Sequence, residues 1–81
     1  NNMKYIVTAT SINRDDYKPF KINQDGSMWT REEEIDTTKN EIFRDCEGLY
    51  DVEDTYEAYW NRLNNNYKNK DIVKVLNVRR K

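Results

Sequence analysis

The chain has 81 residues, of which 36% are hydrophobic and 36% charged, and its 14 basic and 15 acidic side chains give a formal net charge of -1. It contains no histidine and a single cysteine, Cys46, which excludes His-dependent nucleophiles, His or Cys-based zinc sites and an intrachain disulfide. These proportions predict one small domain over residues 1–81, with a thin core to which six tyrosines and two tryptophans contribute.

The N-terminal segment predicts a strand. Residues 4–12 (KYIVTATSI) are rich in β-branched side chains, and Tyr5, Val7 and Ala9 alternate onto one face. Asn1 and Asn2 precede Met3, so we expect Met3 to be the natural start and the two asparagines to be an added remnant.

The next segment, residues 17–29, is compatible with either a β-hairpin or an extended arm. Pro19 lacks a backbone donor, so residues 19–22 begin a short strand or lie at a sheet edge. Residues 23–26 (NQDG) then predict a turn that ends in Asp-Gly.

A first helix is predicted from Thr30 to Gly48. Residues 30–33 (TREE) match a capping box, in which a threonine hydroxyl and a glutamate three residues later satisfy free backbone donors. Apolar side chains then recur at helical spacing, and Gly48 is the expected stop. This apolar stripe consists of Ile35, Ile42, Phe43 and Cys46.

A second helix is predicted after a cap at Asp51 or Asp54, and the asparagine run at 64–66 is expected to end it. Its apolar face follows the helical period. That face consists of Val52, Tyr56, Tyr59, Trp60 and Leu63.

The C-terminal segment 71–78 (DIVKVLNV) predicts a second strand, with apolar side chains on both faces. We therefore expect a small α+β domain in which the N- and C-terminal strands pair, two amphipathic helices cover one face, and a hairpin strand is an optional addition. Residues 79–81 are expected to form a loose basic tail.

The charges are strongly segregated along the chain. Residues 1–30 carry four basic and three acidic side chains, residues 31–60 carry three and eleven, and residues 61–81 carry seven and one. On two helices the acids of the middle third would form a strongly negative surface. A merely solvated helical face is the simpler interpretation of such a run.

The sharper interpretation is a non-enzymatic protein-interaction module that binds a partner with a basic surface. Tyr50 is the candidate anchor, because aromatic side chains bury large areas while charges steer the encounter. The expected fixed negative charges are Glu33, Asp36, Glu41, Glu53, Asp54 and Glu57. Such a small acidic protein suits a phage or mobile-element inhibitor (anti-CRISPR-like), a nucleic-acid mimic that occupies the basic groove of a host nucleic-acid-binding or defence protein.

The alternative is a small nucleic-acid-binding protein, with Tyr67 available to stack on a base. No zinc-finger, helix-turn-helix or RNP-type motif accompanies the basic segment. Its candidate residues are Lys68, Lys70, Lys74, Arg79 and Arg80. A homodimer through an unpaired edge strand is also compatible with the pattern.

Catalysis is not expected, because no recognisable catalytic spacing occurs and histidine is absent. Asp51, Glu53, Asp54 and Glu57 lack the spacing of a calcium loop, so neither a metal nor a cofactor is expected. Cys46 is expected to be a buried, inert thiol. No apolar run approaches the roughly 20 residues of a membrane span, and no signal-peptide core is present, so a cytoplasmic location is expected.

Overall fold

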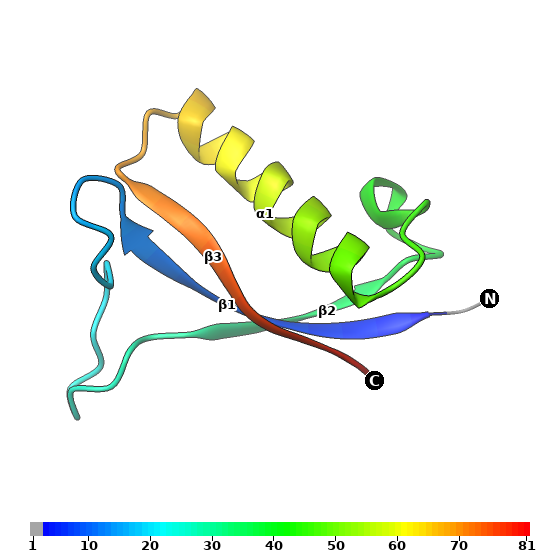
Figure 1. Cartoon of the computed structure of the whole chain (residues 1–81), viewed down its shortest axis with the longest axis horizontal. Helices are drawn as coiled ribbons and strands as arrows, with labels where there is room; N and C mark the ends of the chain where they lie inside the picture. Colours follow the sequence, from blue (N-terminus) through cyan, green and yellow to red (C-terminus); the bar gives the residue numbers. More distant parts are fainter. Residues whose placement is uncertain (1–2) are drawn as a thin grey trace.

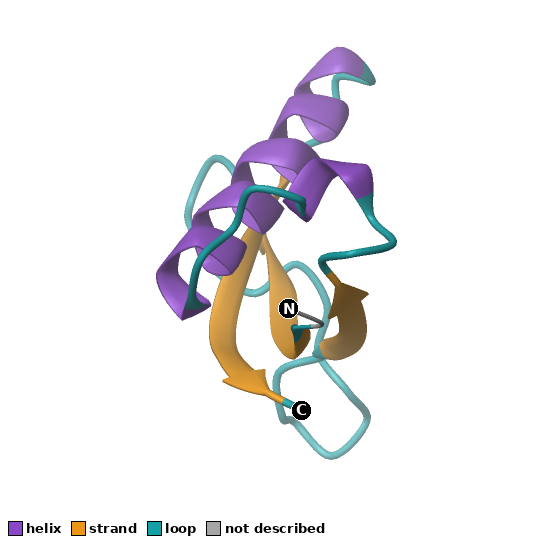
Figure 2. Cartoon of the chain, turned by 90° about the vertical axis from the view of Figure 1, so that its right-hand side faces the viewer, coloured by secondary structure: helices purple, strands orange, loops and turns teal. Residues whose placement is uncertain are grey.

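The computed structural model describes residues 3–81, which fold into a three-stranded antiparallel sheet with one long helix against it. The elements are β1 (Lys4–Asn13), β2 (Arg31–Asp36), the 3-10 turn η1 (Glu41–Phe43), α1 (Leu49–Asn66) and β3 (Asp71–Arg80). The sheet order is β2-β1-β3, and α1 lies across one face of the sheet (Figures 1 and 2). The α+β class and the pairing of the N- and C-terminal strands are confirmed; the expectation about Asn1 and Asn2 falls outside the described residues.

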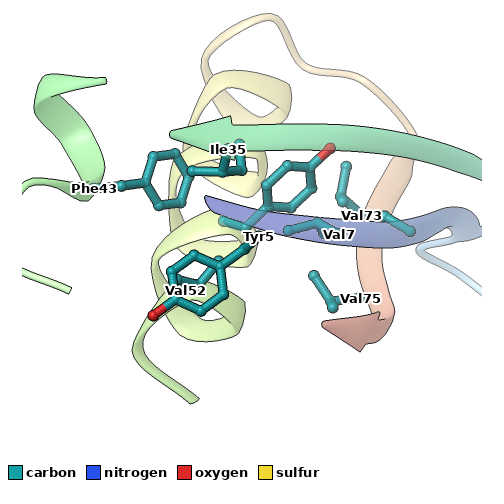
Figure 3. Packing of buried hydrophobic residues seen from close by; sticks show 9 residues of the cluster. Tyr5, Val7, Ile35, Phe43, Val52, Val73 and Val75 are labelled. Carbon is teal, nitrogen blue, oxygen red and sulfur yellow. The ribbon is translucent and has the colours of Figure 1, made fainter. Parts of the chain in front are cut away.

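β1 is the central strand, because it pairs with β2 on one side and with β3 on the other. Its alternating side chains therefore supply the middle of the core. Tyr5, Val7 and Ala9 are fully buried, as their shared face predicts. Tyr5 pairs with Ile35 of β2 on one side and with Arg80 of β3 on the other. Figure 3 shows the resulting core between sheet, helix and η1. Its buried members are Tyr5, Val7, Ala9, Ile35, Phe43, Val52, Tyr56, Val73 and Val75.

The predicted helix after Thr30 is wrong, because residues 31–36 form β2. Alternate side chains of β2 turn towards α1, and Ile35 among them is buried. Pairing with β1 along the whole strand outweighs the local capping-box preference. The side chains predicted to form one apolar helix face therefore do not share a face. Phe43 is buried in η1, whereas Ile42 is 45% exposed.

The one long helix begins earlier than predicted. Gly48, expected as a helix stop, is instead the N-cap of α1, and neither Asp51 nor Asp54 occupies that position. Val52 and Tyr56 are buried, while Trp60 packs against the core from its edge. α1 ends at Asn66, within the asparagine run as predicted, but the left-handed conformation falls two residues later, at Lys68, with φ 56°.

β3 is longer than predicted and forms an edge of the sheet. Its buried residues Val73 and Val75 face α1, and the pairing with β1 shifts by one residue between Thr8 and Ala9, as in a β-bulge. The loose tail expected at 79–81 is wrong, because Arg79 and Arg80 are the last two residues of β3. The backbone N–H of Lys81 also bonds to Lys4.

Residues 14–30 form an arm whose tip folds back as a short hairpin, in which the Trp29 N–H donates to the Lys21 carbonyl at 3.2 Å. Isolated bridges join Ile12 to Pro19 and Ile22 to Met28, and the predicted turn closes at Gly26, with φ 88°. The hydroxyl of Thr10, itself buried, anchors the end of the arm by donating to the Trp29 carbonyl at 2.6 Å. Within residues 3–81 no helix is long and apolar enough to cross a membrane.

Candidate functional site

The first feature that positions the charged side chains is a polar seam between α1 and β3. The Asn61 side chain bonds both backbone groups of Val73, accepting from its N–H at 2.8 Å and donating to its carbonyl at 3.1 Å. Glu57 accepts the Val75 N–H at 2.7 Å. Four helical residues, from Glu57 to Asn61, advance about 6 Å, and two strand residues advance about 6.7 Å, so the two spacings match along the seam.

The seam satisfies backbone groups on the free edge of β3, where another strand would otherwise pair. Glu57 is therefore not the outward fixed charge that the sequence predicted. Its carboxylate is half-buried and committed to the fold.

Glu33 is likewise committed to the interior of the molecule. It lies on the helix-facing side of β2 and accepts the Tyr56 hydroxyl at 2.9 Å. Burial, followed by this bond to a carboxylate, raises the pKa of Tyr56 to about 12. The guanidinium of Arg31 stacks beside them, with its carbon 4.8 Å from the Trp60 ring centroid. The prediction that Glu33 belongs to a solvated helical face is wrong.

Asp36 closes the turn after β2. Its carboxylate accepts the backbone N–H of Thr38 at 3.0 Å and the Thr38 hydroxyl at 2.7 Å. These bonds hold the pKa of Asp36 below its ordinary value. Because residues 31–36 form β2, Asp36 does not lie on a helical face as predicted.

The remaining acids do gather, around η1 and the first turns of α1. Residues 41–54 carry six carboxylates and one cation, Arg44, which makes a weak, exposed pair with Glu41 at 3.8 Å. Five of the carboxylates are exposed and Glu53 is half-buried. We call this region the acidic surface, and its charged members are Glu41, Asp45, Glu47, Asp51, Glu53 and Asp54.

Apolar groups interrupt the acidic surface. Tyr50 is 75% exposed, and Ile42 and Leu49 are also exposed. A hollow of about 260 Å³ joins η1 to α1, with one apolar wall and three carboxylates around it. Its lining residues are Ile42, Asp45, Cys46, Asp51, Asp54 and Thr55.

Three members of the acidic surface are not among the residues that the sequence predicted for partner binding: Asp45, Glu47 and Asp51. The acid density of residues 41–54 indicates all three, but a helix over residues 30–48 favours only the acids at helical spacing. Asp51 also accepts the Glu47 backbone N–H at 2.9 Å, which fixes the entry to α1.

The predicted basic set is divided between the two ends of the sheet. Lys68 and Lys70 lie in the turn between α1 and β3, whereas Arg79 and Arg80 lie at the other end of β3. Arg79 pairs with Glu32 of β2 at 3.8 Å across the sheet face opposite α1. The five residues therefore do not form one footprint.

No cluster of three or more potential metal ligands occurs within residues 3–81. Cys46 is half-buried, with its sulfur 3.4 Å from the Thr55 hydroxyl oxygen. Comparison with known proteins gives no match to a family model, a curated protein or a solved structure. The surface chemistry of the chain must therefore support any functional proposal.

Proposed function

We propose that the protein is a non-enzymatic interaction module whose acidic surface docks onto a basic surface of another protein. One observation carries the proposal: an aromatic side chain that is 75% exposed, Tyr50, lies in the first turn of α1 within a segment that carries six carboxylates. Exposed aromatics are typical anchors, because they bury a large area at low entropic cost.

The charges and the apolar groups have complementary tasks in such a surface. Carboxylates at long range steer a cationic partner towards the site and set its orientation. Apolar area that becomes buried on binding, with release of water, is then supplied by Tyr50, Leu49 and Ile42. A purely solvated face has no need of three exposed apolar side chains in the same region.

The same combination favours partners that normally hold nucleic acid, because their grooves present arginine and lysine together with aromatic side chains. Carboxylates on a helix start can take the place of phosphates there. We extend the proposal to an inhibitor that competes for such a groove on a nucleic-acid-binding or defence protein, as a phage or mobile-element product would.

The test compares two triple variants in affinity capture from the native host, read by quantitative mass spectrometry. The first variant neutralises the hollow with Asp45→Asn, Asp51→Asn and Asp54→Asn. The control removes three exposed charges elsewhere with Asp16→Asn, Asp25→Asn and Glu32→Gln.

We expect the wild type and the control to retain the same basic proteins, and the first variant to lose them. Tyr50→Ala should lose the same proteins without changing net charge. If both triple variants capture the same set as the wild type, the acidic surface is not the docking site.

A further inference from the structure

The opposite end of α1 carries a second charged surface, formed where the chain turns from α1 into β3. Two adjoining hollows of about 290 and 360 Å³ share Arg14 and Asn65 in their walls. We call them together the basic hollow. Its cationic members are Arg14, Arg62, Lys68 and Lys70.

Backbone bonds hold these cations together although they come from distant parts of the chain. The Arg14 N–H donates to the Lys70 carbonyl at 2.9 Å, which joins the end of β1 to the turn before β3. Within that turn, Asn69 bonds to Asn64 through its backbone N–H at 2.8 Å and its side chain at 3.2 Å. Figure 1 shows the two connecting loops side by side at this end of the molecule.

The basic hollow has an excess of positive charge that the fold does not use. Its lining contains four cations and one carboxylate, Asp15. None of the four cations forms an ion pair within residues 3–81, unlike Arg79 and Lys81 at the other end of β3. The C-terminus of α1 contributes only about half a negative charge, so the local field stays positive.

An exposed aromatic residue adjoins one of these cations in the chain, although it is not part of the lining of either hollow. Tyr67 precedes Lys68 in the turn and is 76% exposed. The side-chain amides of Asn65 and Asn69 add uncharged hydrogen-bonding groups to the lining. Cations that track phosphates, combined with an exposed ring on which a base can stack, are the recurring elements of single-strand recognition.

We propose that the basic hollow binds single-stranded nucleic acid, with the four cations contacting phosphates and Tyr67 stacking on an unpaired base. A single strand fits better than a duplex, because a paired base is not available to a ring at the surface. This site lies apart from the acidic surface and does not depend on the proposed protein docking.

The test is fluorescence anisotropy with a labelled 12-nucleotide oligothymidine, a duplex of equal length as competitor, and the full chain. With four phosphate contacts, affinity should fall about 50-fold between 50 and 200 mM salt. Arg62→Ala with Lys70→Ala should reduce that fall to about 7-fold. The matched control, Lys39→Ala with Arg44→Ala, removes two exposed cations outside the hollow and should behave as wild type.

Tyr67→Ala should weaken binding without changing the salt dependence, which separates stacking from phosphate contact. Absence of binding at 50 mM salt, or equal binding by wild type and the Arg62/Lys70 variant, would overturn the proposal. Equal affinity for the duplex, or full displacement by pyrophosphate with no effect of Tyr67→Ala, would also overturn it in favour of a general anion site.

Discussion

The acidic surface and the basic hollow lie at opposite ends of α1 and differ in what surrounds the charges. Around the acids, exposed Tyr50 and Ile42 provide apolar area suited to a protein partner. Around the cations, asparagine amides and Tyr67 provide groups suited to nucleic acid. Both placements also suit the helix dipole, which favours acids at the N-terminus and cations at the C-terminus.

Some of the charged side chains form hydrogen bonds within the fold, whereas others are free to contact a partner. Glu33, Asp36 and Glu57 bond to Tyr56, Thr38 and Val75 and so hold the fold together. Asp45 and Asp54 of the 260 Å³ hollow and the cations of the basic hollow remain available to partners, whereas Asp51 of the same hollow also accepts the Glu47 N–H. A net charge of -1 conceals both surfaces.

The largest expected effect comes from breaking the seam that holds α1, and with it both surfaces, against β3. Asn61→Ala removes the partner of both Val73 backbone groups and should lower the free energy of unfolding by about 2–4 kcal/mol. Urea denaturation followed by circular dichroism measures this loss. Asn65→Ala, an exposed helix position, is the control and should cost less than about 0.5 kcal/mol.

The same Asn61 variant uncovers part of the β3 edge, so light scattering should detect more self-association than in the wild type at equal concentration. A monomeric variant with wild-type stability would contradict the role assigned to the seam.

A middle-sized effect is expected at Tyr56, which links the helix to the Glu33 carboxylate. The pKa of Tyr56 is about 12 in the folded protein, above its ordinary value of 10.0. The contribution of the neutral Tyr56 hydroxyl to the free energy of unfolding is therefore complete below pH 10 and is lost as the pH rises towards 12, because the unfolded chain loses this proton first. Tyr56→Phe should cost about 1–2 kcal/mol at neutral pH through loss of the hydrogen bond.

In addition, Tyr56→Phe should remove part of the alkaline fall in stability, measured by urea denaturation between pH 9 and 12. Tyr67→Phe changes an exposed ring and should leave that profile as in wild type. Identical profiles for all three proteins would show that Tyr56 is not held neutral by its surroundings.

The smallest effect concerns the acids that begin α1. Asp51→Asn should destabilise the protein by about 0.3–1 kcal/mol at low salt, and less at high salt, because it weakens the interaction with the helix dipole. Thermal melts at two salt concentrations measure the difference. Asp16→Asn, in the arm, should show no such salt-dependent loss; an equal loss in both would exclude a local helix effect.

Strong, long patterns allowed β1, β3 and α1 to be predicted from sequence. β2 could not be, because only Ile35 among its six residues is a buried hydrophobic, and TREE satisfies a helix start locally. Pairing with β1 makes this segment a strand, and such a non-local contact cannot be recognised from the sequence of the segment itself.

Only part of the candidate site could be predicted from the sequence, for the same reason. Glu57 on a helix looks like a solvated carboxylate, since nothing in its neighbourhood along the chain reveals that Val75 lies beside it. Likewise Arg14 is 48 residues from Arg62 in the chain, and it joins the basic hollow only through the sheet. The exposure of Tyr50 and Asp54 was predicted correctly, because exposure at a helix start follows from the local pattern.

The central claim, that α1 separates two surfaces with different ligands, is tested most directly by one ¹⁵N–¹H correlation experiment. A lysine- and leucine-rich peptide and the oligothymidine are titrated separately into labelled protein. The account predicts that the peptide shifts amides within residues 41–54, and that the oligonucleotide shifts those of Arg14 and residues 62–70. Shifts from both ligands in the same residues, or from neither ligand, would contradict it.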